Sequence, residues 1–236
     1  MAKSKPKPAA ATKPKAKAKV GPDVREIFRR FRAAEAEPKG ELEHVNAYTL
    51  LVAVVLSAQA TDAGVNKATR ALFKAADTPA KMLALGEEKL IEHVKTIGLY
   101  RGKAKNVIAL SRLLIERHGG EVPADRDALI DLPGVGRKTA NVVLNMAFGQ
   151  KTMAVDTHVF RVSHRLGMAD GKTPDAVEEQ LMAVVPDEFL FHAHHWLILH
   201  GRYTCKAKAP RCGLCVVAEL CTSGDKVGGA LATRKN

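Results

Sequence analysis

Apolar residues recur along most of this chain every three or four positions, the spacing that places side chains on one face of an α-helix. The first such face falls within residues 24–31, and Asp23 just before it is a suitable N-cap. The run 48–56, YTLLVAVVL, is apolar on all sides and ends at Ser57. That run therefore predicts a helix enclosed by other parts of the protein.

The same spacing predicts further helices along the rest of the chain. Their ranges are 61–74, 79–85, 87–96, 101–117, 125–131, 137–148, 156–166, 175–185 and 190–203. The alternating pattern typical of β-strands is nearly absent. The prediction is therefore an all-α fold of about ten helices, with helix ends placed to within a few residues.

Both ends of the chain differ from this helical middle. Residues 1–20 hold seven lysines, three prolines and no acidic residue, so we expect a disordered basic tail over residues 1–21. Residues 223–236 are expected to form a flexible C-terminal tail. The N-terminus lacks a secretory signal, and no apolar run approaches the ~20 residues of a membrane span. We therefore expect a protein of the reducing cytoplasm.

The charge balance indicates the kind of partner. The net charge is +12, and the chain without its tail lysines still carries +5. Such a surplus favours a polyanionic partner, because the positive charges repel one another without one. A basic domain that is merely soluble is the alternative. Aromatic residues make up only 5% of the chain, which argues against a single-strand binder built on rows of stacking rings.

A candidate anion site lies between two predicted helices, in LPGVGRKTA at residues 132–140. Gly134 and Gly136 flank one apolar residue and predict a tight turn whose backbone N–H groups lead into a helix N-terminus. Such a turn can hold a phosphate without reading base sequence. Arg137 before the lysine excludes a nucleotide P-loop, and Thr139 excludes a dinucleotide fingerprint. An ordinary glycine-containing turn between helices is the alternative.

Lys138 and Asp156 are the candidate catalytic pair. We expect Lys138 in the first turn of its helix, where the helix dipole and Arg137 both disfavour the ammonium form. A lysine amine with a lowered pKa can attack a sugar C1′ and form a Schiff base. Asp156 opens the next helix, and its carboxylate can assist deprotonation and stabilise positive charge on a deoxyribose. The alternatives are a lysine that points into water and an aspartate that only caps its helix.

All four cysteines fall in one short segment, spaced as Cys205-x6-Cys212-x2-Cys215-x5-Cys221. In a reducing compartment, this clustering indicates a single four-thiolate metal site rather than disulfides. Zinc usually lies between two C-x2–4-C pairs, whereas the wide outer gaps here suit a larger iron–sulfur cluster. Spacing alone leaves both metals open.

Together these motifs resemble the endonuclease III family of helix-hairpin-helix DNA glycosylases, over about residues 22–222. The resemblance rests on residues 132–148, VDTHVFRV from Val155, SAQATD at 57–62 and the cysteine spacing. It implies a six-helix barrel domain over residues 40–150. It also implies an iron–sulfur cluster domain formed by residues 22–39 and 151–222, with the active-site cleft between the two.

The resemblance further implies roles for individual residues. Lys138 would be the nucleophile, Asp156 the essential carboxylate, and the four cysteines the ligands of a [4Fe–4S] cluster. Gln59 and Leu99 would fill the gap that an extruded nucleotide leaves in the duplex. The other implied DNA-binding residues are Leu132, Gly134, Val135, Gly136, Arg137, Thr157 and His158.

The implied activity is base-excision DNA repair by a bifunctional enzyme. Its N-glycosylase would remove oxidised pyrimidines from double-stranded DNA, and its lyase would cleave the abasic site by Schiff-base β-elimination. We expect a monomer associated with the nucleoid, whose partner is duplex DNA with oxidised pyrimidines or abasic sites.

Two rival interpretations are less consistent with the residues. The adenine glycosylase branch typically lacks the hairpin lysine and carries an additional C-terminal domain, for which we expect the fifteen residues after Cys221 to be too few. A non-catalytic DNA-binding protein with a structural zinc would need neither Lys138 nor Asp156.

Overall fold

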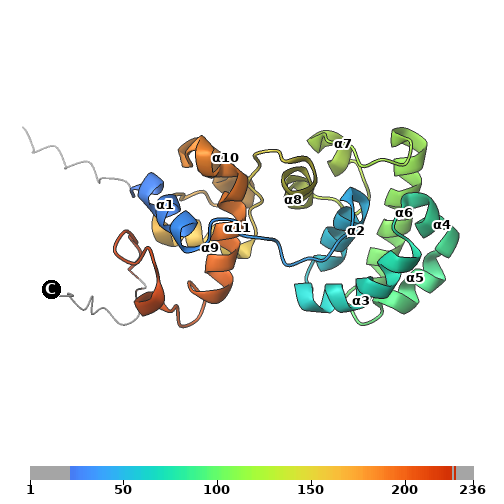
Figure 1. Ribbon diagram of the computed structural model, residues 1–236, viewed down its shortest axis with the longest axis horizontal. Helices are drawn as coiled ribbons and strands as arrows, with labels where there is room; N and C mark the ends of the chain where they lie inside the picture. The colour runs from blue at the N-terminus through green and yellow to red at the C-terminus, as the bar shows by residue number, and fades with distance from the viewer. Residues whose placement is uncertain (1–21, 225, 227–236) are drawn as a thin grey trace, which may run out of the picture.

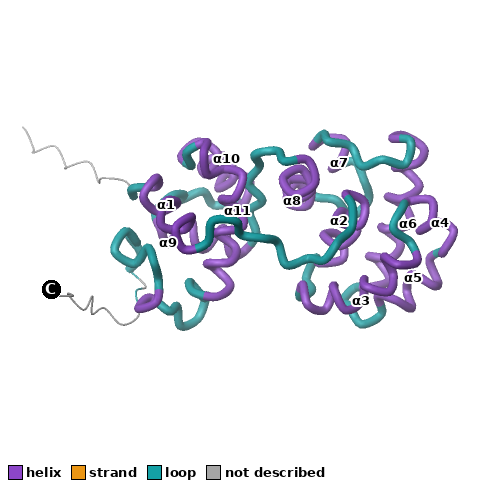
Figure 2. Tube along the Cα trace, viewed as in Figure 1, coloured by secondary structure: helices purple, strands orange, loops and turns teal. Residues whose placement is uncertain are grey.

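A computed structural model describes residues 22–224 and 226, and its regular structure is helical (Figures 1 and 2). No strand occurs in that part of the chain, which confirms the all-α prediction. The predicted tail 1–21 and most of the predicted tail 223–236 lie outside the described residues. Within the same limits, no helix combines the length and the apolar character needed to cross a bilayer.

The helices follow the predicted order. They are α1 Val24–Ala34, α2 Ala47–Ser57, α3 Asp62–Ala75, α4 Pro79–Leu85, α5 Glu87–Val94, α6 Tyr100–His118, α7 Arg126–Ile130, α8 Arg137–Phe148, α9 Thr157–Leu166, α10 Pro174–Val184, α11 Asp187–Tyr203 and a short 3₁₀ turn Cys212–Leu214. The largest difference from prediction is the start of α11, at Asp187 rather than at residue 190. Asp187 and Glu188 carry no apolar signal, but acidic side chains suit the positive end of a helix.

Local polar residues explain where most helices begin and end. The side chains that cap helix N-termini belong to Asp23, Asn46, Thr61, Thr78, Asp125, Asp156 and Thr173. Each accepts a hydrogen bond from a backbone N–H of the first turn, which would otherwise lack a partner. Helices α6, α8 and α9 end at glycines in the left-handed conformation, which a glycine adopts without steric cost.

The described helices form two hydrophobic cores that lie at opposite ends of the molecule (Figure 1). The first core is formed by the helices from α2 through α8, and every residue from Tyr48 to Leu56 is buried. The second core joins α1 to α9, α10 and α11. A long connection between α1 and α2 and a shorter one between α8 and α9 link the two ends (Figure 2). The domain boundaries stated above remain predictions.

Candidate active site

The hairpin between α7 and α8 has the geometry of an anion site. Gly134 adopts a φ of +80°, and the Val135 N–H donates to the Leu132 carbonyl oxygen over 3.0 Å. The side chains of Leu132 and Val135 are buried, so they anchor the turn and leave only their backbone to face a ligand. Gly136 is the N-cap of α8 and offers no side-chain cap, so the first N–H groups of this helix remain open to an anion.

Lys138 lies half-buried in the first turn of α8 and lines a pocket with about 480 Å³ of space. We call this the central pocket; it lies between the two cores, and Asp62, His194 and Arg202 also line it. Among the described residues, nothing forms a hydrogen bond or ion pair with the Lys138 amine. Burial lowers the pKa of Lys138, and Arg202 lowers it further, whereas Asp156 and Asp62 oppose the shift.

Arg137 makes contacts that the sequence did not predict, while its expected DNA-binding role stays a prediction. Its guanidinium donates to both carboxylate oxygens of Glu178 on α10, over 2.9 and 3.1 Å, and lies 3.9 Å from Asp175. The cation that lowers the pKa of Lys138 is Arg202 rather than Arg137. Arg137 therefore connects the first core to the second, because Glu178 belongs to α10.

Asp156 caps α9, which confirms its N-cap interpretation. Its Oδ1 atom accepts hydrogen bonds from the N–H groups of His158 and Val159, each over 2.8 Å. These two bonds fix the carboxylate while Oδ2 has no hydrogen-bond partner among the residues described. Thr157 beside it is exposed, and the His158 Nδ1 atom lies 3.2 Å from the Arg161 guanidinium. An oriented carboxylate with one available oxygen can also act on a bound ligand.

The central pocket contains polar groups to which the sequence assigns no catalytic or binding role. Arg202 of α11 donates to Asp62 of α3 over 2.6 Å and to Glu41 of the connection between the cores. His194 of α11 is buried, and its Nδ1 atom has no partner among the described residues. Burial, followed by His195 and Lys138, holds the pKa of His194 well below its ordinary value. The imidazole is therefore uncharged at neutral pH.

Gln59 and Leu99 share an unusual backbone conformation. Their φ angles are +54° and +59°, the left-handed region that residues other than glycine rarely adopt. Both side chains are exposed, Leu99 to 66%. A Cβ atom added to Gly98 would lie 3.9 Å from the Gln59 carbonyl oxygen, so the two loops are neighbours. Strain of about 1–3 kcal/mol at each such residue is typical of functional sites.

A second pocket joins the Leu99 loop to the hairpin. This wedge pocket has about 1080 Å³ of open space, and its walls include Leu99, Tyr100, Lys103, Asn106 and Gly134. The contact is close, because a Cβ atom on Gly134 would lie 2.9 Å from the Asn106 amide nitrogen. Two of the predicted DNA-binding segments therefore share one surface.

The four cysteines are free thiols that surround a cavity with about 430 Å³ of space. No group of cysteine, histidine or acidic side chains in the described chain is arranged to hold a single metal ion. Four thiols that line one pocket, with no tetrahedral single-ion arrangement among the described residues, are consistent with the ligands of an inorganic cluster. The residues present therefore fit a [4Fe–4S] cluster.

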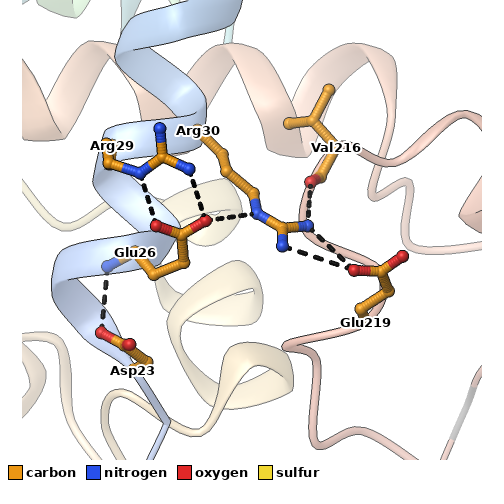
Figure 3. Close-up of polar contacts among 6 residues, drawn as sticks. All are labelled: Asp23, Glu26, Arg29, Arg30, Val216 and Glu219. Carbon is orange, nitrogen blue, oxygen red and sulfur yellow. Dashed lines mark hydrogen bonds and ion pairs between the residues drawn. The ribbon is translucent and has the colours of Figure 1, made fainter.

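Arginines from the second core hold the cysteine segment in place. Arg161 donates to the Cys205 carbonyl oxygen over 3.1 Å, and Arg165 donates to that of Lys206 over 2.7 Å. From α1, Arg30 donates to the Val216 carbonyl oxygen over 3.2 Å and to the carboxylate of Glu219 (Figure 3). The helix nearest the described N-terminus thus contacts the segment nearest the C-terminus.

Comparisons with known proteins agree with this geometry. Residues 52–187 match the family described as HhH-GPD superfamily base excision DNA repair protein, and residues 205–221 match the iron–sulfur binding domain of endonuclease III. The chain is 59% identical to endonuclease III of Treponema pallidum, over 84% of this chain and 94% of that protein. It is 57% identical to endonuclease III of Escherichia coli K12, over 86% of this chain and 96% of that protein. The chain belongs to the endonuclease III family.

Solved structures of the endonuclease III family superpose well on this chain. A trapped endonuclease III–DNA covalent intermediate matches with a TM-score of 0.80 and 47% identity, over 85% of this chain and 95% of that one. A thermostable thymine-DNA glycosylase matches with a TM-score of 0.74 and 26% identity, over 84% of this chain and 93% of that one.

Family membership confirms the main predictions. The protein is a base-excision repair enzyme of the endonuclease III type, a DNA glycosylase and abasic-site lyase. It carries a [4Fe–4S] cluster, which settles the choice that cysteine spacing left open. The roles of individual active-site residues remain predictions.

Proposed function

We propose that Lys138 and Asp156 together remove oxidised pyrimidines from duplex DNA and then cleave the abasic site. The observation that carries this proposal is the Lys138 amine, which has no partner among the described residues and lies at the central pocket with a pKa lowered by burial. A desolvated amine keeps a larger neutral fraction, and only the neutral form is a nucleophile. Asp156 lies near enough to influence its pKa.

The residues act in sequence on an extruded nucleoside. The Lys138 amine attacks C1′, the bond between C1′ and the base breaks, and the base departs with a proton. Asp156 stabilises the positive charge that develops on the deoxyribose and accepts the proton that Lys138 releases. The C1′–O4′ bond then breaks and O4′ takes up a proton, which opens the sugar ring and leaves a Schiff base between Lys138 and C1′. This Schiff base makes a C2′ proton acidic, and loss of that proton breaks the C3′–O3′ bond, so the 3′ phosphate leaves and the strand is cut.

The central pocket suits a base that carries carbonyl and hydroxyl groups. Arg202 supplies hydrogen-bond donors, Asp62 supplies acceptors, and the uncharged His194 offers a ring nitrogen. Oxidised pyrimidines carry added oxygen atoms that such a lining can bind, whereas an apolar pocket would leave them without partners. These contacts favour oxidised pyrimidines as the substrate class.

The remaining predicted residues position the DNA. Gln59 and Leu99 would occupy the gap left by the extruded base, and their exposed, strained loops support that role. The open N–H groups at Gly134 and Gly136 would hold a backbone phosphate. Thr157 and His158, at the start of α9, would contact the DNA strand near Asp156. One chain supplies every group in this proposal, so we expect a monomer.

The [4Fe–4S] cluster, when bound, supplies four iron–thiolate bonds that fix the fold of the cysteine segment. That segment carries Lys206, Lys208 and Arg211, whose positive charges can approach a DNA backbone. Arg161 and Arg30 hold its carbonyl oxygens from two different helices.

Borohydride trapping tests the proposal. Wild-type protein, Lys138→Gln and the control Lys151→Gln, which alters an exposed lysine, are each incubated with duplex DNA that contains thymine glycol or an abasic site. We expect a covalent adduct with the wild type and the control, and none with Lys138→Gln, which should still bind an uncleavable abasic analogue. Strand cleavage by Lys138→Gln would contradict the assignment of the nucleophile.

A further inference from the structure

Lys103, in the first turn of α6, is buried in an unusual way for a lysine. Lys103 is only 6% exposed, and its amine is covered by protein. No hydrogen-bond acceptor or acidic side chain among the described residues contacts that amine. Burial lowers its pKa. Lysines are rarely enclosed unless they are paired, so the missing partner is expected to come from outside the chain.

The surroundings of Lys103 suit an anion. Lys103 is one of the residues that line the wedge pocket, where the described lining contains a second cation, Arg101, and no acidic residue. Leu99 is the N-cap of α6 and supplies no side-chain cap, so the first N–H groups of this 19-residue helix face the same region. A Cβ atom added to Gly102 would meet nothing within 4 Å, so a ligand can approach this turn closely.

We propose that Lys103 binds a backbone phosphate of the DNA, held in the wedge pocket between the Leu99 loop and the hairpin at Gly134. The proposal rests on the proposed function, because only bound duplex brings a phosphate to this pocket. Lys103 would then be a positioning residue: it would fix the strand between the inserted Leu99 and the phosphate held at the hairpin. The amine is covered in the free protein, so phosphate binding would require a local shift of the side chains that cover it.

This arrangement predicts opposite effects on the free and the bound protein. In the free protein Lys103→Met removes a buried charge that has no partner, so Tm should stay unchanged or rise. With DNA, the same substitution removes a hydrogen bond between charged groups, so affinity should fall by about 10-fold or more. The matched control is Lys105→Met, which removes an exposed charge two residues along the same helix.

The experiment measures binding of the intact, cluster-containing protein to a duplex with a tetrahydrofuran abasic analogue. Single phosphates around the analogue are replaced in turn by uncharged methylphosphonates. In the wild type and Lys105→Met, one replacement near the analogue should weaken binding by about 10-fold, and in Lys103→Met this same replacement should have no effect. The slope of log K against log salt should also become shallower by about 0.9 in Lys103→Met.

Three results would overturn the proposal. A fall in Tm for Lys103→Met would show that the amine has a partner within the protein. Unchanged affinity would show that it contacts no DNA. Weaker binding with every methylphosphonate effect retained would show that it contacts something other than a phosphate. Absence of a borohydride adduct with the wild type would instead overturn the proposed function, so the two failures are distinguishable.

Discussion

Glu178 joins the two cores, and its removal gives a measurable test of that connection. Its side chain is 6% exposed, and its carboxylate accepts hydrogen bonds from Arg137 over 2.9 and 3.1 Å and lies 3.5 Å from Arg126. Loss of one partner from a buried ion pair costs about 3–5 kcal/mol. The Arg137 and Arg126 side chains are 35% and 39% exposed, so water can partly replace the carboxylate. We therefore expect Glu178→Ala to lose about 2–3 kcal/mol.

Thermal unfolding of the cluster-containing protein, followed by circular dichroism, measures this loss. A change of 1 kcal/mol shifts Tm by about 2–4 °C in a domain of this size, so we expect a fall of about 4–12 °C. Glu179→Ala is the control, because Glu179 is the exposed neighbour on the same helix. Adding Arg137→Ala to Glu178→Ala should cost little more, since both remove one interaction. A Tm equal to that of the control, or fully additive losses, would refute the reasoning.

Two further predictions concern the active site. Arg202→Gln removes a cation that lowers the pKa of Lys138 and leaves Asp62, which raises it. The pKa of Lys138 should therefore rise, so less of its amine is neutral at a given pH. The acidic limb of the pH profile of the trapping rate should then move to higher pH. An unmoved limb would exclude an effect of Arg202 on the pKa of Lys138. Leu99→Gly relieves a left-handed φ of +59° but removes the side chain that we propose enters the DNA. The free energy of unfolding should therefore change by no more than about 1 kcal/mol, while lesion excision slows. Leu99→Ala is its comparison, and unchanged excision by both variants would show that the side chain is not inserted.

Local signals in the sequence were sufficient for most of the helical framework. Helix ends follow from caps such as Asn46 and Thr61, which act within three residues of their own position. The apolar run of α2 specified its complete burial. The apolar pattern places the start of α11 three residues too late, because the first turn of this helix carries Asp187 and Glu188 instead of apolar residues. These carboxylates are favourable there because they lie at the positive end of the helix dipole.

The site was less predictable because its contacts join distant parts of the chain. Arg137 and Glu178 are 41 positions apart, and Arg202 and Asp62 are 140 apart. No local pattern pairs such residues, so the sequence predicts that the adjacent residue, Arg137, is the cation that acts on Lys138, whereas the structure gives this role to Arg202. The left-handed conformations of Gln59 and Leu99 were equally hidden, because neither residue type favours them.

The pKa of Lys138 therefore depends on the assembly of the two cores. Lys138 and Asp62 belong to helices of the first core, whereas Arg202 and Asp156 belong to segments of the second. Burial is the largest cause of the lowered pKa, and that burial exists only while both walls of the central pocket are in place. If the cores separate, water returns to the amine and its pKa rises toward the ordinary value. The same contacts that hold the two ends of the molecule together thus keep the amine of the proposed nucleophile, Lys138, in its neutral form.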